Sequence, residues 1–270
     1  MTQSFYAITW TDVFVSLIFV AISVGLIRWW KIGLEKTLLI GTLRTFIQLA
    51  AMGFILTYFF QPHHWSFMVG LISLMIVIAS YEGYRRLKKY KIPNLFWILL
   101  GSFFFTVFIV LGIILKFILS VEPWFYPYAM IPIAGMIIGN ALNSITLTVN
   151  RFVSEITHRE NEIEMLLSLG APVKSAVHDS FKESVRAALL PNINGLMTVG
   201  LVQLPGVMTG QILAGIDPLI AIRYQIMIMY MWISTVTMVD ILVLNLVYRQ
   251  FFTPQMQLKR VLLRKTSINK

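Results

Sequence analysis

The chain has 270 residues, of which 57% are hydrophobic and 13% charged, and its mean hydropathy is +0.77. An ordinary soluble domain is excluded, because such domains are roughly 45–50% apolar and about 25% charged. The sequence contains no cysteine, which excludes disulfides and thiolate metal ligands. The net charge of +10 resides in short loops between apolar runs, so it indicates membrane topology, and we expect no nucleic-acid partner.

Long apolar runs predict an all-α polytopic membrane protein with about seven transmembrane helices, because several runs exceed the ~18 residues needed to cross a bilayer. We expect a single transmembrane domain over residues 1–270, located in the cell (inner or plasma) membrane as a multi-pass protein. The expected spans, in chain order, are Ile8–Ile27, Leu38–Phe60, Trp65–Ser80, Leu95–Leu119, Tyr128–Val149, Leu189–Leu213 and Tyr224–Val247.

The distribution of basic residues predicts the orientation. All 22 Lys and Arg residues except Arg44, Lys116 and Arg223 fall in alternate loops, which lie on one and the same side of the membrane. Because Lys and Arg are enriched in cytoplasmic loops, the N-terminus is predicted outside and the C-terminus in the cytoplasm, which requires an odd number of spans.

The second span contains Arg44 and Gln48. Arg44 lies about 12 Å beyond Lys36 at helical rise, which is too deep for an ordinary flanking charge. A mid-span arginine costs at least ~2.5–3.5 kcal/mol on insertion scales. Arg44 therefore either has a structural role, reaching the headgroups or pairing with Glu82 or Asp240, or it lines a transport pathway with Gln48.

The fifth span combines small residues with amides. Gly135 and Gly139 form a Gly-x-x-x-Gly pair, a pattern that lets another helix backbone approach closely. Asn140 and Asn143 add hydrogen-bonding groups at bilayer depth. These residues either hold helices together, within the chain or across a dimer axis, or contribute to the pathway.

The sixth span is the most unusual, and we expect it to be a moving or pathway-lining element. Pro205 should kink the helix, since proline removes a backbone donor and clashes with the preceding turn. Amides at bilayer depth should face protein or water rather than lipid. The candidate pathway residues of this span are Gln203, Pro205, Gly206, Met208, Gly210 and Gln211.

The segment at about residues 150–188, between the fifth and sixth spans, is the only sizeable polar one. It is amphipathic with helical periodicity, Gly170 is suited to end a helix, and Pro172 is suited to start one. We therefore predict a helical hairpin on the cytoplasmic face, with its tip near Leu169–Val173, that docks onto a partner.

Catalytic motifs are missing from the sequence. There is neither a G-x-x-x-x-G-K-[ST] phosphate-binding loop nor an H-E-x-x-H zinc motif. We therefore expect a transport subunit without its own nucleotide site, with no cofactor of its own and with no metal ligands that the sequence identifies.

The run E-M-L-L-S-L-G (Glu164–Gly170), followed by Ala171, resembles the coupling loop of ABC transporter permeases. Met165 and Leu166 stand where the importer form of that loop has alanines. The resemblance implies that the ATPase subunit is contacted by Glu162, Glu164, Leu169, Gly170, Ala171 and Pro172.

A second resemblance covers nearly the whole chain. Matching blocks are Arg44-x-x-x-Gln48-Leu49, IPIAGMIIGN (Ile131–Asn140), SLGAP (Ser168–Pro172), SVRAALLP (Ser184–Pro191) and TVGLVQLPGVMTGQILAGIDPLIAIRYQIMIM (Thr198–Met229). They resemble FetB-type permeases, bacterial iron exporters related to plant aluminium-tolerance permeases. The resemblance implies a permease homodimer among membrane lipids. It also implies a separate ABC ATPase that binds ATP and Mg, and export of a metal ion, with iron the first candidate.

An alternative is a secondary transporter driven by an ion gradient. Arg44, Glu82 and Asp240 would then relay charge, and the sixth span would hold the substrate. The two hypotheses differ in whether transport requires ATP.

Overall fold

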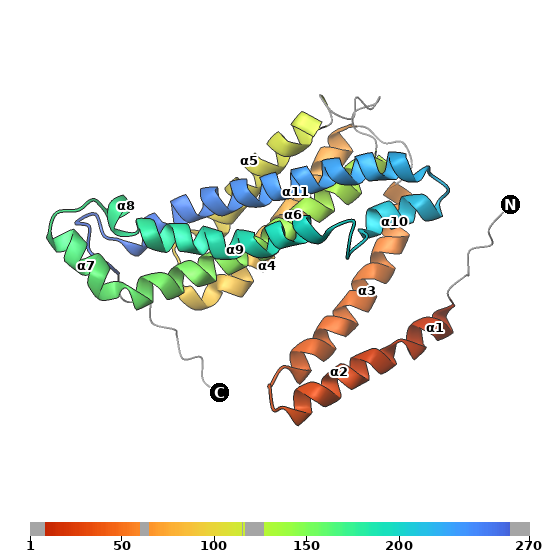
Figure 1. Cartoon of the computed structure of the whole chain (residues 1–270), viewed down its shortest axis with the longest axis horizontal. Helices are drawn as coiled ribbons and strands as arrows, with labels where there is room; N and C mark the ends of the chain where they lie inside the picture. Colours follow the sequence, from red (N-terminus) through yellow and green to blue (C-terminus); the bar gives the residue numbers. More distant parts are fainter. Residues whose placement is uncertain (1–8, 60–64, 115, 117–126, 260–270) are drawn as a thin grey trace. The chain divides into compact units, whose positions relative to one another are not determined.

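The structure is a computed structural model that describes residues 9–59, 65–114, 116 and 127–259 (Figure 1). The chain divides into two compact units, Met1–Pro62 and His63–Lys270. Throughout the described ranges the regular secondary structure is helical, as the apolar runs predicted.

The first unit is a helical hairpin made of α1 (Trp10–Val15), α2 (Leu17–Trp29) and α3 (Glu35–Phe59). Thr9 and Asp12 form a capping box that starts α1. α2 packs against α3, and the Trp10 and Phe46 rings meet edge to face at 6.1 Å. None of the apolar window Trp10–Trp29 is buried in the chain, so this hairpin presents its side chains to lipid or to other protein.

The second unit is a bundle built around α6. This helix packs against α4, α9 and α11, and α5 packs against α4 and α11. At 32 residues α6 is about 48 Å long, which exceeds the ~30 Å hydrocarbon core. The long helices of the bundle are α4 (Trp65–Leu87), α5 (Leu95–Ile113), α6 (Pro127–His158), α9 (His178–Thr198) and α11 (Pro218–Val247).

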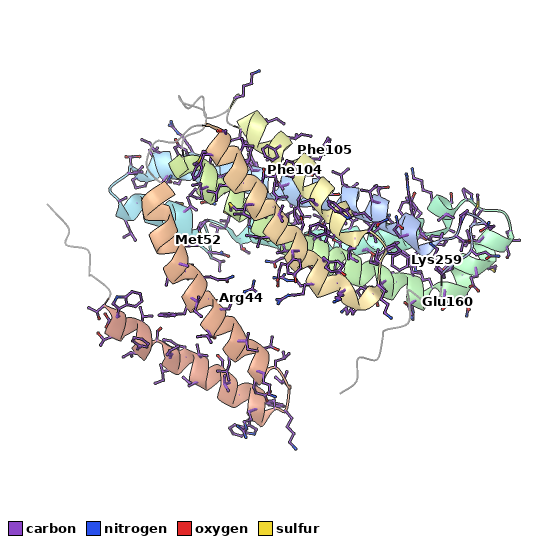
Figure 2. All side chains as sticks on the ribbon, turned by 180° about the vertical axis from the view of Figure 1, so that it is seen from behind. Arg44, Met52, Phe104, Phe105, Glu160 and Lys259 are labelled. Atoms are coloured by element: carbon purple, nitrogen blue, oxygen red, sulfur yellow. The ribbon has the colours of Figure 1, made fainter. Side chains whose placement is uncertain are left out.

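The two faces of α5 show how the bundle is packed. Leu95, Leu99 and Phe103 recur every four residues and are fully buried against the neighbouring helices. Phe104 and Phe105 lie on the opposite side and project outward, as Figure 2 shows. A helix with an apolar exterior as well as an apolar interior is typical of a membrane span.

Five helices among the described residues are long and apolar enough to cross a membrane. Their windows are Trp10–Trp29, Ser66–Tyr90, Leu95–Ile113, Met130–His158 and Pro218–Phe251. The prediction of a multi-pass helical membrane protein is therefore confirmed, whereas the count of seven spans and the orientation stay predictions. The expected second span falls on α3.

Several helices extend beyond the expected spans, among them α6 to His158 and α11 from Pro218, and the sixth span differs in kind. The third span was expected to end at Ser80, but α4 continues to Leu87, where Arg85 and Arg86 bind Glu82 along the helix surface and stabilise its last turns. The sixth span was expected to be one kinked helix, and it is interrupted.

Contacts gather the ends of several helices at one end of the second unit. The Tyr90 hydroxyl donates to Asn150 Oδ1 at 2.8 Å, and Phe152 meets Phe251 edge to face at 5.8 Å. These segments carry basic residues that the charge distribution assigns to the cytoplasm. We call this region, which includes α7 (Glu160–Ser168) and α8 (Val173–Ala176), the basic end (Figure 1).

Candidate functional site

The predicted helical hairpin is present at the basic end. α7 (Glu160–Ser168) and α8 (Val173–Ala176) are joined by a tight turn, and Gly170 lies there at φ +86°. The Ala171 N–H donates to the Leu166 carbonyl and the Gly170 N–H to the Leu167 carbonyl, both at 3.0 Å. This is a Schellman motif, in which glycine supplies the left-handed conformation that ends the helix.

Apolar side chains project from the tip of the hairpin. Leu169 is 76% exposed and Met165 is 56% exposed. Pro172 follows as the N-cap of α8, so the tip lies at residues 169–173, as the sequence predicted. Exposed apolar side chains on a structured tip are typical of a protein-docking surface. Of the predicted coupling residues, Glu162 and Glu164 lie on α7 and the other four form this turn.

Arg159 holds the base of the hairpin. It lies between α6 and α7, and its guanidinium approaches carboxylates on three helices: Glu155 of α6 at 3.6 Å, Glu162 of α7 at 4.0 Å and Asp179 of α9 at 3.6 Å. Glu155 also binds Arg151 at 2.8 Å. Such a network fixes the direction of the hairpin better than isolated surface pairs do.

The predicted kink at Pro205 is a complete break. α9 ends at Thr198, α10 (Gly206–Leu213) begins after the proline, and residues 199–205 between them are non-helical. Pro205 is the N-cap of α10, where its missing N–H removes no helical hydrogen bond. The kink prediction was wrong because the helix ends well before the proline: Val199 already has extended backbone, and Gly200 follows at φ +85°.

The break has a defined local structure. The Gly200 N–H donates to the Gln203 carbonyl at 2.9 Å, and the Val202 N–H donates to the Thr198 carbonyl at 3.0 Å. Leu201 is 90% exposed, and Gln203 is also exposed. The break therefore forms a small closed loop that presents apolar and amide side chains outward.

The two glycine pairs do not pack against each other within the chain. A Cβ placed on Gly139, Gly206 or Gly210 would meet nothing within 4 Å, whereas one on Gly135 would lie 3.3 Å from the methyl carbon of Met75. Packing of the open glycines across a dimer axis stays a prediction.

The remaining candidates of the interrupted span lie on α10. Met208 and Gln211 are half-buried there. The Gln211 Oε1 atom is buried and has no hydrogen-bond partner among the described residues. A buried amide oxygen without a donor is costly, so this position suits a polar group brought by a partner or a cargo.

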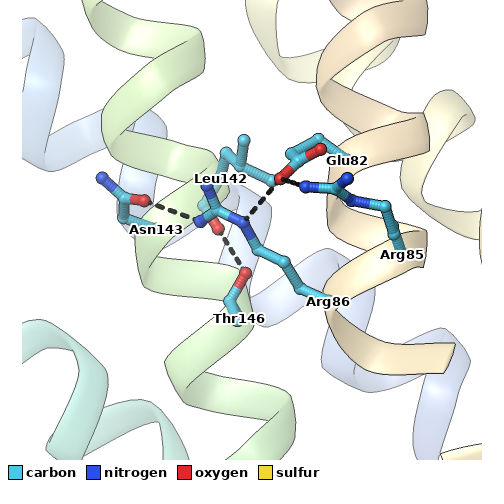
Figure 3. Close-up of polar contacts among 6 residues, drawn as sticks. All are labelled: Glu82, Arg85, Arg86, Leu142, Asn143 and Thr146. Atoms are coloured by element: carbon cyan, nitrogen blue, oxygen red, sulfur yellow. Dashed lines mark hydrogen bonds and ion pairs between the residues drawn. The ribbon is translucent and has the colours of Figure 1, made fainter. Parts of the chain in front are cut away.

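Asn140 and Asn143 of α6 differ in their surroundings. The Asn140 side chain donates to the Met136 carbonyl within its own helix. Asn143 accepts a 2.9 Å hydrogen bond from Arg86 of α4, and Arg86 also binds Glu82, as Figure 3 shows. Asn143 thus connects two helices, which favours the structural alternative for this residue.

A buried acid joins α6 to α11. The Ser144 hydroxyl donates to Asp240 Oδ2 at 2.6 Å, and Asp240 is 0% exposed. The Oδ1 atom has no hydrogen-bond partner in the described part of the chain. Intramembrane carboxyl groups are rare and are associated with function, so Asp240 belongs among the candidate residues.

Arg44 and Gln48 lie one turn apart on α3, in the first unit, and both side chains are exposed within that unit. A pair between Arg44 and Glu82 or Asp240 would join the two units and stays a prediction. Across the described ranges no group of three His, Asp or Glu side chains is placed to hold a metal ion.

Sequence reasoning missed three contacts that the fold creates. Asp179 meets Arg159, Arg86 meets Asn143, and Ser144 meets Asp240, each across helices far apart in sequence. The sequence showed only the i, i+4 spacing of Glu155 and Arg159, which indicates an ion pair within one helix. It did not indicate that Arg159 connects three helices.

Comparison with known proteins gives a consistent result. The model of the uncharacterised protein family UPF0014 matches residues 10–252. The "Probable iron export permease protein FetB" of Escherichia coli is 38% identical over 236 residues, covering 87% of this chain and 89% of the relative. The "Protein ALUMINUM SENSITIVE 3" of Arabidopsis thaliana is 32% identical, covering 90% of this chain and 88% of the relative.

A further relative is the "UPF0014 membrane protein YjkA" of Bacillus subtilis, which is 35% identical over 91% of this chain and 96% of its own length. No solved structure matches the chain.

Proposed function

This chain belongs to the family UPF0014, and on that premise we propose that it is the permease subunit of an ATP-driven ABC transporter that exports a metal ion. Membership of this family identifies the chain as a multi-pass membrane permease. Iron is the first candidate cargo, because a relative with 38% identity is named a probable iron export permease. The proposed assembly is a permease homodimer with separate ATPase subunits that bind ATP and Mg.

The hairpin at the basic end is the observation that carries this proposal. The Schellman turn at Gly170 fixes the shape of the tip, and Arg159 fixes its base, so the exposed Leu169 is presented on a rigid element. A short helical element with an apolar end suits insertion into a groove of a partner protein. The partner would be the ATPase.

The hairpin leads directly into the interrupted helix. α9 starts just after α8, packs along α6 and α11, and ends at the break. A displacement of the hairpin by the ATPase would therefore reach residues 199–205 through one continuous helix. Gln203, Met208 and Gln211 are the proposed pathway residues, since they place amide and thioether groups at or just beyond the break.

The first experiment is co-purification with a candidate ATPase and ATP-dependent metal transport in proteoliposomes. Gly170→Pro should keep the membrane fold but uncouple ATP hydrolysis from transport, because proline cannot adopt φ +86°. Gly170→Ala is the matched control. It should retain most coupling, since alanine enters the left-handed region at a cost of about 1–2 kcal/mol.

A second variant tests the charge on the hairpin. Glu164→Lys should uncouple hydrolysis from transport, whereas Glu164→Gln should have a smaller effect because it keeps size and polarity. Normal coupling in both Gly170→Pro and Glu164→Lys would show that the hairpin does not receive the ATPase.

The buried Asp240 favours a second candidate, a secondary transporter driven by an ion gradient, with Arg44, Glu82 and Asp240 as relay charges. This alternative predicts metal transport by the chain alone, without ATP, that is abolished by ionophores. Full transport by the purified chain in the absence of any ATPase would replace the first proposal by this one.

A further inference from the structure

The last turn of α4 and the segment that joins it to α5 concentrate positive charge. We call their basic residues the basic turn, and they are Arg85, Arg86, Lys88, Lys89 and Lys91. All of them are exposed. The two arginines bind Glu82, whereas none of the ion pairs among the described residues involves the three lysines. No carboxylate among the described residues neutralises them, and the Lys89 ammonium lies over the Tyr90 ring at 4.8 Å from its centroid.

Two cavities open at the basic turn and share Lys89. One, of about 620 Å³, is lined by basic side chains of the turn together with Tyr84 and Ile92. The other, of about 720 Å³, lies against α6, where Ser154 supplies a hydroxyl group, while the Thr157 hydroxyl donates to the Val153 carbonyl. An ammonium group beside a hydroxyl donor favours a phosphate group as ligand.

The backbone of the turn is fixed in an unusual conformation. η1 (Lys88–Tyr90) is followed by Lys91 at φ +49°, and the Lys91 N–H donates to the Lys88 carbonyl at 3.1 Å. Glycine or asparagine normally fills such a left-handed position, so a lysine there carries a backbone cost that is commonly found at functional sites. The Tyr90 hydroxyl anchors the turn to Asn150 of α6.

The basic turn has exposed aromatic and apolar neighbours. Trp97, near the start of α5, is 67% exposed, and Tyr81 and Ile78 of α4 are also exposed. Aromatic side chains at this position are typical of the membrane interface. The positive charge thus lies at the end of an apolar surface. This arrangement matches a lipid, whose phosphate headgroup is charged and whose acyl chains are apolar.

We propose that the basic turn is a specific binding site for the phosphate of an anionic membrane lipid. Lys88, Lys89 and Lys91 bind the headgroup, and the acyl chains lie along the exposed faces of α4 and α5. Basic pockets between helices on the cytoplasmic side are suited to such headgroups. The predicted orientation places this turn on that side. The site is independent of the proposed transport activity.

The test counts bound lipid by native mass spectrometry after transfer of the intact chain from phosphatidylglycerol-containing liposomes into detergent. Lys88→Gln, Lys89→Gln and Lys91→Gln are combined in one variant. The matched control combines Lys174→Gln, Lys182→Gln and Arg186→Gln, which remove the same charge from exposed positions of α8 and α9.

The wild type and the control should retain a bound phosphatidylglycerol molecule. The basic-turn variant should bind it roughly 100-fold more weakly, because each of the three lysines contributes about five-fold in affinity at low ionic strength. All proteins should elute as the same folded species in size-exclusion chromatography. Equal retention by the basic-turn variant and the control would overturn the proposal.

Two further arms identify the source of the phosphate. Phosphatidylcholine should not replace phosphatidylglycerol, and glycerophosphoglycerol or inorganic phosphate should compete only weakly, because they lack acyl chains. Competition by inorganic phosphate at the lipid's own affinity would show a free-phosphate site instead. If the basic-turn variant kept its lipid but lost a co-purifying protein, the surface would be a protein-docking site and the proposal would be wrong.

Discussion

The hydrogen bond between Ser144 and Asp240 gives a quantitative test of how α6 is held to α11. The Ser144 hydroxyl donates to Oδ2 at 2.6 Å, both residues are buried, and Oδ1 has no partner within the described chain. The perturbations are Ser144→Ala, Asp240→Asn and the double substitution. Ser102→Ala is the matched control, because the Ser102 hydroxyl is equally buried but makes no hydrogen bond among the described residues.

Ser144→Ala should lower the free energy of unfolding by about 1–3 kcal/mol, since it removes a donor from a buried acceptor. Ser102→Ala should change it by less than about 0.5 kcal/mol, because no partner is lost. Asp240→Asn should change the free energy of unfolding little. The amide oxygen of asparagine can still accept from Ser144, and an uncharged amide needs no cation to compensate it. In the Asp240→Asn background Ser144→Ala should cost roughly 1 kcal/mol less.

The assay is thermal unfolding in detergent, in which 1 kcal/mol corresponds to roughly 2–4 °C for a chain of this size. A melting temperature for Ser144→Ala equal to that of Ser102→Ala would refute the role of the hydrogen bond. A loss in Asp240→Asn larger than that in Ser144→Ala would show instead that a cation compensates the carboxylate in the folded protein.

Three other predictions concern the basic end and the helix starts. Arg159→Gln should speed hydrogen exchange over residues 160–176 more than Arg151→Gln does, because Arg159 alone of the two reaches α7 and α9; equal exchange would contradict this. Asp217→Ala should lower the melting temperature by about 2–4 °C through loss of its N-cap bond to α11, whereas Asp217→Asn should not. Arg86→Gln should cost less than about 1 kcal/mol in urea or heat denaturation because the arginine is exposed, and a larger loss would show a stronger α4–α6 link.

Local sequence signals predicted the hairpin well. Gly170 and Pro172 punctuate the polar segment, and glycine has a clear conformational advantage at the left-handed end of a helix. The apolar period before this turn predicted the first helix, and Pro172 as a helix-start residue predicted the second. Because all of these signals act within a few residues, no tertiary information was needed.

The break after α9 was predicted only in part from the sequence. Pro205 was recognised as a disruption, but a single proline is compatible with a kink. The full interruption begins at Val199, whose backbone is extended, and continues at Gly200, which is left-handed and donates to the Gln203 carbonyl. Glycine is compatible with either path, so the sequence alone did not decide between them.

Contacts between distant helices were beyond local patterns. Nothing near Ser144 distinguishes it from other buried hydroxyls, and its contact with Asp240 arises only when α6 packs against α11. Asn143 illustrates the same point, because its connection to Arg86 required the register of α4 against α6. The candidate residues were identified from their polarity, but their partners depend on the fold.

The loop at residues 199–205 has a practical consequence. Its Leu201 and Val202 are 90% and 84% exposed, yet irregular backbone within a bilayer is stable only where protein or water solvates its peptide groups. Since the natural chain contains no cysteine, a thiol introduced at either position would be unique in the molecule. Its reaction with a membrane-impermeant maleimide, compared between nucleotide states of the proposed transporter, would report directly when water reaches this part of the polypeptide.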